Sequence, residues 1–300
     1  MLFLQDLDRC YSLAYSPDGT CLALGGAGEV GQGMLILWDW LSGQKRTIFL
    51  HGGPVQAVAF SPDGRWLAAA VNRSIRLIDL ATAQLRAKFS RHTRSVSSLA
   101  FSPGGRFLIS AAEGRSLLHT GGEVNRWDLQ RWKRGRPRLL TSLPEYRGFC
   151  SVAYLRGRRI LLGSKDGEIF LWDVAAKEYQ EQFKQRAAVR SLAVSPKGGR
   201  LATAAGRVVH IWNLKENRHL GTLKGHKRFV RSVAFTPNGK ILLSGSWDGM
   251  VRMWGVSRKR LLACFDWGIG KIEAVAVAPD GMTAAAAGQG AVVWDLESGY

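Results

Sequence analysis

A segment of alternating side-chain classes recurs along the chain and usually closes with proline, one further residue and glycine. Residues 55–64 read Val-Gln-Ala-Val-Ala-Phe-Ser-Pro-Asp-Gly, and related copies span 11–19, 96–105, 189–198, 230–239 and 272–281. A seventh copy, 149–157, lacks the proline. Alternation with a period of two is typical of a strand. Proline favours the second position of a tight turn and glycine the position with positive φ. Each copy therefore predicts a strand that enters a hairpin.

A second marker follows each turn, where an apolar run ends in a large side chain that usually precedes Asp or Asn. These markers are Trp38-Asp39, Ile78-Asp79, Trp127-Asp128, Trp172-Asp173, Trp212-Asn213, Trp254-Gly255 and Trp294-Asp295. They recur on average about every 43 residues. A further short apolar stretch follows each marker except the last. The pattern predicts four strands per repeat, which we call a, b, c and d, and no long amphipathic helix.

The repeat length, the Trp-Asp endings and the Gly225-His226 dipeptide resemble the WD-repeat family of β-propellers. The resemblance covers the whole chain. It implies an all-β fold, a seven-bladed β-propeller of four-stranded antiparallel blades, as a single domain over residues 1–300. The expected blade cores are approximately 10–50, 55–90, 96–143, 149–184, 189–224, 230–265, and 272–296 together with 1–6.

The two ends of the chain are expected to complete one blade between them. Only four residues follow Leu296, so the seventh repeat lacks its own strand d. The apolar residues 1–4 precede the first strand a and have no other partner. We therefore expect the N-terminal strand to pair in the last blade, which closes the ring and covers an open sheet edge.

The resemblance also implies a blade-stabilising quartet of buried polar residues that satisfy one another. The sequence places it in the sixth repeat only, with His226, Asp248, Trp254 and either Ser244 or Ser246. Elsewhere it is incomplete. His51 and His92 match the histidine position. In the repeat of His51, Asn72 replaces the aspartate, and in the repeat of His92 the turn that would carry the aspartate is expanded.

Composition narrows the class of protein. Apolar residues make up 46% and charged residues 22% of 300, as in ordinary globular proteins, and the formal net charge is +19. No apolar run is long enough to span a membrane, and the N-terminus lacks the basic start of a signal peptide. The four cysteines form no metal-type pair, so a reduced, cytoplasmic location without membrane insertion is expected.

No catalytic constellation stands out, and the expectation is a non-enzyme without cofactor or metal. Residues 26–31 fit the spacing GxGxxG, but an apolar run with a strand's Trp-Asp ending follows instead of a helix. Dinucleotide binding is therefore not expected, because the helix N-terminus would hold the pyrophosphate. His210 precedes Trp212 by two and has no ligand partner at metal spacing along the chain.

Positive charge gathers in segments that the family geometry assigns to the a–b and c–d connections of the lower face. The residues are Arg131, Lys133, Arg134, Arg136, Arg138, Arg156, Arg158, Arg159, Arg258, Lys259 and Arg260. The planar guanidinium suits phosphates and carboxylates. Such a strip would attract nucleic acid, an anionic membrane or an acidic protein segment, and a simple solvated basic surface is the alternative.

The family resemblance also implies an upper rim, formed by the starts of strands a and by the b–c turns, where partners bind. Positions of that kind here include Arg190, Arg231, Lys165 and Trp247, with Arg228, Phe229, Trp267, Tyr146 and Arg147 in nearby loops. Exposed Trp, Tyr and Arg are typical of interface hot spots. An alternative is that Trp247 or Trp267 covers contacts between blades.

Two functional hypotheses follow. The first is a non-catalytic scaffold that binds a protein or peptide partner, possibly acidic, on the upper rim, within a larger complex. The second is a nucleic-acid or ribonucleoprotein-binding propeller that uses the basic strip. The functional half of the first hypothesis rests on fold-level analogy.

Overall fold

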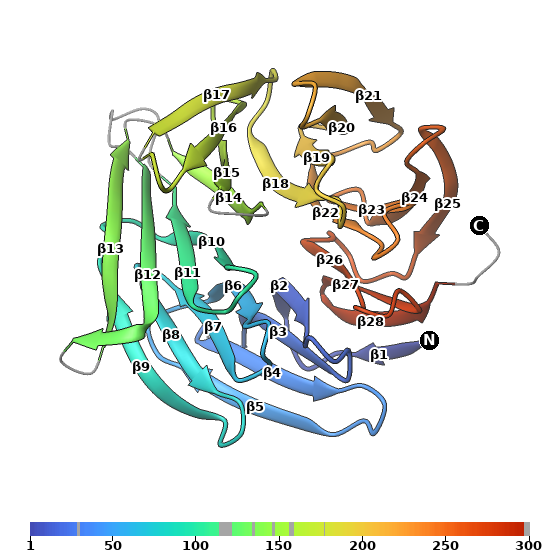
Figure 1. The fold of residues 1–300 in the computed structure, drawn as a ribbon. Coiled ribbons are helices and arrows are strands. Elements are labelled where there is room, and N and C mark those ends of the chain that lie inside the picture. Colours follow the sequence, from blue (N-terminus) through green and yellow to red (C-terminus); the bar gives the residue numbers. More distant parts are fainter. Residues whose placement is uncertain are drawn as a thin grey trace.

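The recurring segments form seven antiparallel sheets of four strands, arranged around a central axis (Figure 1). The computed structural model describes residues 1–28, 31–113, 122–133, 136–145, 148–155, 159–176 and 178–296, with only the backbone for 132–133, 136–145 and 179–181. No helix occurs in these ranges. The predicted seven-bladed β-propeller is confirmed.

Each of the first three blades follows the chain from its inner strand a to its outer strand d. Blade 1 contains β2 (Arg9–Tyr15), β3 (Cys21–Ala27), β4 (Gly33–Asp39) and β5 (Lys45–Leu50). Blade 2 contains β6 (Val55–Phe60), β7 (Trp66–Val71), β8 (Ser74–Asp79) and β9 (Gln84–Ser90). Blade 3 contains β10 (Val96–Phe101), β11 (Phe107–Ala112), β12 (Gly122–Lys133) and β13 (Arg136–Glu145).

The next three blades repeat this order. Blade 4 contains β14 (Phe149–Tyr154), β15 (Arg159–Ser164), β16 (Glu168–Asp173) and β17 (Glu178–Lys184). Blade 5 contains β18 (Val189–Val194), β19 (Arg200–Ala205), β20 (Val208–Asn213) and β21 (Arg218–Lys224). Blade 6 contains β22 (Val230–Phe235), β23 (Ile241–Ser246), β24 (Met250–Gly255) and β25 (Arg260–Asp266).

The seventh blade joins the two ends of the chain, as expected. It has the order β1 (Leu2–Leu4), β28 (Gly290–Asp295), β27 (Thr283–Gly288) and β26 (Ala274–Val277). Leu2 pairs with Val293 and Leu4 with Ala291 in antiparallel register. Leu4 is buried whereas Phe3 is half exposed. The N-terminal strand thus covers the edge of β28 and closes the ring.

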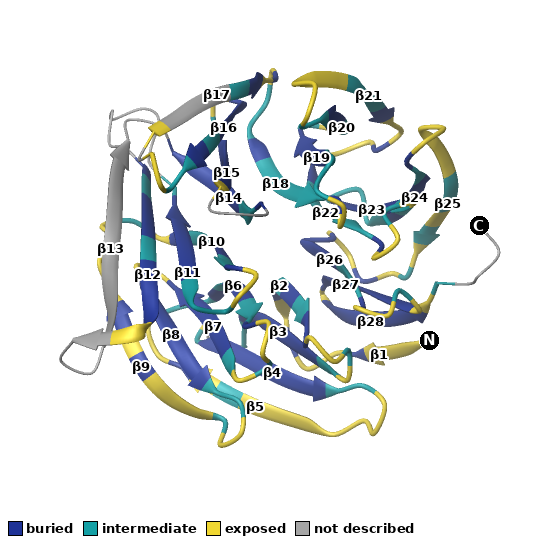
Figure 2. Ribbon diagram, viewed as in Figure 1, coloured by how far each residue is buried: buried dark blue, intermediate teal, exposed yellow. Residues whose placement is uncertain are grey.

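Burial is greatest in the middle of each blade (Figure 2). Strands b such as β7 and β27 are almost wholly buried, strands a such as β18 and β22 are half-buried, and outer strands such as β5 and β25 are largely exposed. Close approach between blades depends on small residues. A Cβ atom on Gly245 of β23 would lie 2.5 Å from the side chain of Ile272, and one on Gly163 would lie 2.6 Å from Val189. Glycine at these two positions lets the next blade pack against strand b.

Serine hydroxyls on the inner strands join neighbouring blades. Ser12 Oγ accepts a hydrogen bond from the Val58 amide at 3.0 Å. The same contact links Ser98 with Val152, Ser191 with Val233, and Ser232 with Val275, at 3.1–3.2 Å. Each bond runs from one blade to the backbone of the next and fixes their relative height around the axis.

Blade 6 brings its four quartet residues together. Trp254 Nε1 donates to Ser244 Oγ at 2.8 Å, and Ser244 Oγ lies 2.8 Å from His226 Nε2. Asp248 accepts from His226 Nδ1 at 3.0 Å and from the Lys227 amide at 2.8 Å. Because a carboxylate only accepts, Nδ1 carries the ring proton and Nε2 accepts from the serine hydroxyl. Ser246 instead donates to the Arg228 carbonyl.

The prediction that only one blade carries the quartet is wrong. In blade 3, Trp127 Nε1 donates to Ser110 Oγ at 3.0 Å, and Ser110 Oγ lies 2.6 Å from His92 Nε2. His92 Nδ1 lies 3.0 Å from Glu123, which also accepts from the Thr93 amide. Glu123 takes the place of aspartate from the start of strand β12 instead of from the b–c turn.

Blade 5 holds a shortened version of the same relay. Trp212 Nε1 donates to Thr203 Oγ1 at 3.0 Å, and Thr203 Oγ1 donates to Gln185 Oε1 at 3.0 Å. Gln185 stands where the other two blades have histidine, four residues before strand a. Its buried Nε2 has no partner in the described part of the chain. The amide thus replaces the imidazole without an acidic acceptor.

Candidate functional site

A bulge near the start of strand a turns one side chain per blade toward the axis. The a–b register shifts at this point in the first six blades, between Cys10 and Ser12 in blade 1 and at matching positions in the others. A bulged residue leaves the ladder and changes its side-chain direction. The residues at this position are Tyr11, Gln56, Ser97, Cys150, Arg190 and Arg231, and Glu273 stands at the same place in blade 7.

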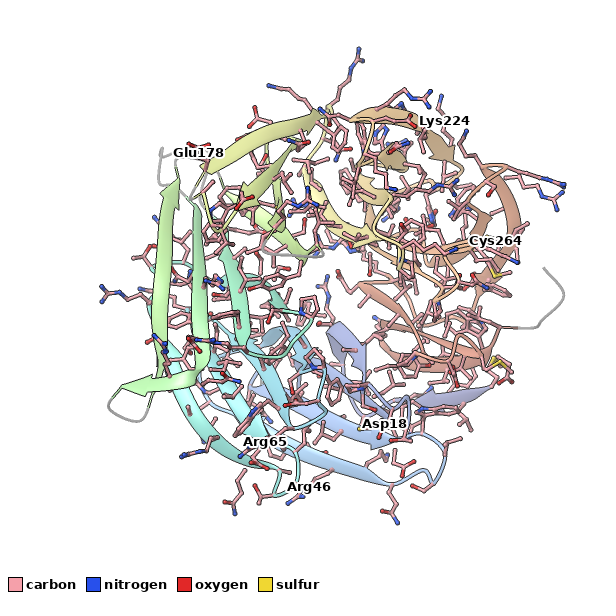
Figure 3. The ribbon with its side chains drawn as sticks, viewed as in Figure 1. Asp18, Arg46, Arg65, Glu178, Lys224 and Cys264 are labelled. Atoms are coloured by element: carbon pink, nitrogen blue, oxygen red, sulfur yellow. The ribbon has the colours of Figure 1, made fainter. Side chains whose placement is uncertain are left out.

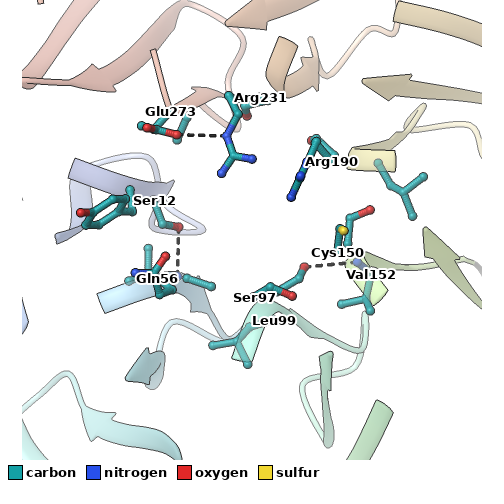
Figure 4. A pocket seen from close by; sticks show the side chains of 18 of the residues that line it. Ser12, Gln56, Ser97, Leu99, Cys150, Val152, Arg190, Arg231 and Glu273 are labelled. Atoms are coloured by element: carbon teal, nitrogen blue, oxygen red, sulfur yellow. Dashed lines mark hydrogen bonds and ion pairs between the residues drawn. The ribbon is translucent and has the colours of Figure 1, made fainter. Parts of the chain in front are cut away.

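These seven residues line a cavity of about 220 Å³ on the axis, together with the inner serines (Figure 4). The side chains of Arg190 and Arg231 point into the opening. Glu113, which follows strand β11, reaches the same cavity. We call this cavity and its bulged residues the channel mouth. Its chemistry is unequal around the ring, because the charged members come from blades 5, 6 and 7 and from Glu113.

Glu273 joins three blades at the channel mouth. Its carboxylate accepts hydrogen bonds from Arg9 and from Arg231 Nε, the latter at 3.0 Å. Only 2% of its side chain is exposed. Burial by itself raises the pKa of this carboxyl, but the hydrogen bond from Arg9 and the charge of Arg231 outweigh burial and the pKa is lowered. Glu273 therefore stays ionised and holds Arg231 at the opening.

Glu113 makes a similar bridge on the opposite side. It lies 2.8 Å from Lys165 Nζ and 3.4 Å from Arg190 Nη1. The channel mouth thus contains four cations, Arg9, Lys165, Arg190 and Arg231, and two carboxylates among the described residues. Arg190 and Arg231 line the cavity itself, whereas Arg9 and Lys165 pair with the two carboxylates from beside it. Over the whole group the cations exceed the carboxylates by two, which favours an anionic group at the opening.

Trp247 lies beside these charges on the b–c turn of blade 6. The guanidinium carbon of Arg231 is 5.3 Å from the Trp247 ring centroid, and Lys271 Nζ is 5.4 Å from it. Phe229 meets the same ring edge to face at 5.9 Å and is 54% exposed. Arg228 is also exposed. The structure therefore gathers Trp247, Arg231, Phe229 and Arg228 on one part of the upper rim.

Trp267 does not join this group as a free rim residue. It stacks on Phe265 with ring centroids 5.0 Å apart and contacts Trp294 at 4.3 Å. It packs against the core between blades 6 and 7. This placement matches the alternative in which Trp267 covers a contact between blades. Tyr146 lies outside the described residues.

The basic strip divides into described and undescribed parts. Arg131 and Arg159 are exposed, as are Arg258, Lys259 and Arg260 around the c–d turn of blade 6. Of Lys133, Arg136 and Arg138 the backbone alone is described, and Arg134, Arg156 and Arg158 lie outside the described residues. Further cations, such as Arg46, Arg65 and Lys224, stand at the circumference of the ring (Figure 3).

One part of the expected strip is not a loop. The family geometry assigns residues 131–138 to a c–d connection, but β12 and β13 extend through most of this segment. Trp132 pairs with Pro137 and Lys133 with Arg136, so only 134–135 separate the two strands. A long two-stranded ribbon can accommodate this proline because it belongs to an outer edge strand.

The GxGxxG segment carries no nucleotide-type geometry. Gly26 lies near the end of β3, and β4 begins at Gly33. Within the described part of that connection Gly31 donates to the Gly28 carbonyl, which forms a turn between strands. A helix N-terminus for a pyrophosphate does not follow it.

Sequence reasoning missed one pair of titratable side chains that lie in contact. His210 Nδ1 lies 3.2 Å from His219 Nε2, on neighbouring strands of blade 5. The spacing along the chain gave no sign of a partner, because the pairing depends on hairpin register. The only available signal was that His219 occupies the expected strand d, next to strand c.

No described helix is long and apolar enough to cross a membrane.

Comparison with known proteins agrees with this geometry. The WD domain, G-beta repeat family model matches residues 43–79, 83–118, 178–213 and 217–255. The match over 217–255 begins in strand d of blade 5 and continues through strands a to c of blade 6. The sequence repeat is therefore offset from the blade by one strand, like the N-terminal strand that closes the ring.

Curated relatives share about a quarter of their aligned residues with this chain. Periodic tryptophan protein 2 of Arabidopsis thaliana is 28% identical over 76% of the chain and 25% of its own length. Protein LST8 homolog of Drosophila melanogaster is 28% identical over 69% of the chain and 66% of its own length. U3 small nucleolar RNA-associated protein 15 homolog of Xenopus tropicalis is 26% identical over 74% and 41%.

The chain thus spans between a quarter and about two thirds of the length of these relatives. Its seven four-stranded blades, its Trp-centred relays and the four repeat matches lead to one conclusion. The chain belongs to the WD-repeat β-propeller family.

Proposed function

We propose that this chain is a non-catalytic interaction scaffold that binds an acidic protein or peptide segment on the upper rim, within a larger assembly. The observation that carries the proposal is the pair Arg190 and Arg231, which two neighbouring bulges aim into the channel mouth. Each guanidinium is held by one carboxylate, and each keeps donors for a second anion.

Trp247 and Phe229 supply the apolar part of this surface. A large aromatic ring beside guanidinium groups is the composition that concentrates binding energy in protein interfaces. One relative is named as a U3 small nucleolar RNA-associated protein, which is consistent with work in an assembly. The partner we propose therefore carries an acidic group for the arginines and an apolar side chain for Trp247.

Affinity purification from the native host, followed by mass spectrometry, tests this proposal. We expect a defined set of proteins to co-purify with the wild-type chain, to survive nuclease treatment, and to be lost from Trp247→Ala and Arg190→Gln. Phe49→Ala is the matched control, because Phe49 is an exposed aromatic residue on outer strand β5. Retention of the same proteins by both rim variants would refute the rim as the binding surface.

A second candidate is nucleic-acid binding by the basic strip. It is supported by the net charge of +19 and by the exposed Arg159 and Arg258 of the lower face. Binding to phosphates would weaken with salt, with a log–log slope of about −0.7 per phosphate contacted on a single strand. A mobility shift with mixed RNA and DNA at two salt concentrations, repeated with Arg159→Glu and Arg258→Glu, separates this candidate from the first.

A further inference from the structure

Three polar atoms form a small triangle on the outer half of blade 5. His210 Nδ1 lies 3.2 Å from His219 Nε2 and 3.1 Å from Thr222 Oγ1, and the third side, from Thr222 Oγ1 to His219 Nε2, measures 3.4 Å. His210 belongs to strand β20, and the other two residues belong to β21. No role in the blade relays or at the channel mouth involves these three side chains.

Strand pairing fixes the triangle in place. His210 is directly opposite Thr222, and His219 is directly opposite Trp212. The strand register shifts between Ile211 and Trp212, and this shift places His219 opposite Trp212 and next to His210. Trp212 is buried and lies 4.7 Å from the His219 ring and 5.7 Å from the His210 ring. The two imidazoles are therefore positioned on a rigid sheet with an indole beneath them.

The His210 imidazole has the electronic form that a metal needs. Burial lowers the pKa of His210, and the neighbouring His219 lowers it further, so His210 is neutral at pH 7. A neutral imidazole offers one nitrogen lone pair. The described hydrogen-bond and ring contacts of these two histidines are with each other, Thr222 and Trp212, and include no carboxylate.

We propose that His210 Nδ1 and His219 Nε2 bind one divalent transition-metal ion of the Zn²⁺ type, with the Thr222 hydroxyl and water completing its coordination. Two nitrogens bound tetrahedrally at 2.0–2.1 Å from an ion are about 3.3 Å apart, which matches the observed separation. Imidazole nitrogens suit Zn²⁺, Ni²⁺ and Cu²⁺, whereas Ca²⁺ and Mg²⁺ prefer oxygen ligands. The two nitrogen ligands thus favour a transition-metal ion over Ca²⁺ and Mg²⁺.

Coordination requires that each ring carry its proton on the nitrogen that does not bind the metal. The metal takes the lone pair of His210 Nδ1, so the ring proton resides on Nε2, and for His219 the proton resides on Nδ1. The hydrogen bond between the rings is replaced by two metal–nitrogen bonds, and small rotations of both rings turn their lone pairs to a common point. No oxidant or second reactant is needed.

A histidine pair that only shares a hydrogen bond is the competing explanation, and the two make different predictions. In the described part of the chain no group of three or more His, Cys, Asp or Glu side chains is placed to hold a metal. The site therefore has two strong ligands, and its affinity depends on both. Removing either histidine should abolish specific binding, whereas a hydrogen-bonded pair would show no ion dependence at all.

The test uses the untagged full chain and ZnCl₂, titrated by isothermal calorimetry after treatment with a chelator. We expect one Zn²⁺ per chain, at least tenfold weaker binding by His219→Ala and by His210→Gln, and a smaller loss with Thr222→Val. His51→Ala is the matched control, because His51 is an exposed histidine in another blade and should leave affinity unchanged. Co²⁺ absorption in the visible range should change with the same stoichiometry.

A stability measurement keeps the proposal testable if a variant folds poorly. An ion that binds only the native state raises the melting temperature, and its stabilisation grows with the logarithm of 1 + [ion]/Kd. We expect Zn²⁺ to raise the melting temperature of the wild type and of His51→Ala but not of His219→Ala, whose side chain is exposed and removable. Absence of Zn²⁺ binding by the wild type, or equal binding by His219→Ala, would overturn the proposal.

Discussion

His92 Nδ1 in blade 3 lies 3.0 Å from a carboxylate oxygen of Glu123, the same distance that separates His226 from Asp248 in blade 6. Two different acids thus complete the same relay of histidine, serine and tryptophan. In blade 6 the acid lies in the b–c turn, six residues before Trp254, whereas in blade 3 it lies in strand β12, four residues before Trp127.

Glu123 should therefore contribute to stability as a relay member. Glu123→Ala removes the acceptor of the buried His92 and of the Thr93 amide, and we expect a loss of about 1–3 kcal/mol in the free energy of unfolding. Urea denaturation measures it. Glu216→Ala, which breaks the exposed Glu216–Arg218 pair, is the control and should change stability by about 0–1 kcal/mol. Equal effects of the two variants would contradict the relay.

The lowered pKa of Asp248 predicts that part of the free energy of unfolding is lost in acid. Burial would raise its pKa, but hydrogen bonds from the Lys227 amide and from His226 lower it to about 2. Because the pKa is lower in the folded than in the unfolded chain, the stabilisation is present above about pH 4 and is lost as pH falls toward 2. Its size is about 2 kcal/mol.

The comparison that isolates this effect is Asp248→Asn against the wild type, by urea denaturation from pH 7 to pH 2. The wild type is expected to be more stable at pH 7, and the difference should shrink between pH 4 and pH 2. Other carboxylates are common to both proteins and cancel in the difference. A difference that stays constant across this range would show that the charge of Asp248 does not stabilise blade 6.

The closing strand should matter for the whole ring. Leu4 is 4% exposed and packs into the core beneath β28, whereas Phe3 on the same strand is 46% exposed. We expect Leu4→Ser to destabilise the protein by about 2–5 kcal/mol, as for deletion of a buried leucine side chain. Phe3→Ser, the control on the same strand, should have an effect below about 1 kcal/mol. Thermal melts of the two variants give the answer.

Close packing between blades can be tested at Gly245. A methyl group there would approach the Ile272 side chain to 2.5 Å, so Gly245→Ala should cost about 1–3 kcal/mol through overpacking. Gly199→Ala is the matched control, because its Cβ would meet nothing within 4 Å. Adding Ile272→Val to Gly245→Ala should recover part of the loss, and absence of coupling in this double-mutant cycle would argue against the contact.

The sequence predicted the seven blades and the ring closure because both depend on local patterns. Alternation sets the strands, Pro-x-Gly sets the hairpins, and the apolar N-terminal residues lack any other partner. Proteins built from repeats favour such reasoning, since each unit contacts only its neighbours. The prediction for residues 131–138 was wrong because the family geometry places a connection there, whereas β12 and β13 continue through most of it and an outer edge strand tolerates the proline.

The site was harder to predict from the sequence because its residues meet across the ring or across a register shift. Glu113 and Arg190 are 77 residues apart, and Arg9 and Glu273 are 264 apart. Nothing in a single repeat specifies that these side chains converge. The pairing of His210 with His219 depends on one bulge between Ile211 and Trp212, which the letters of the strand do not encode.

The bulge at the head of each inner strand has a consequence for how such a protein can change over time. The residue in the bulge is outside the ladder of backbone pairs, so its identity is nearly independent of sheet stability. Arginine, glutamine, tyrosine and cysteine all occur there in this chain. Single substitutions could therefore change the chemistry of the opening one blade at a time, while the serine that follows the bulge in blades 1, 3, 5 and 6 keeps its hydrogen bond to the next blade.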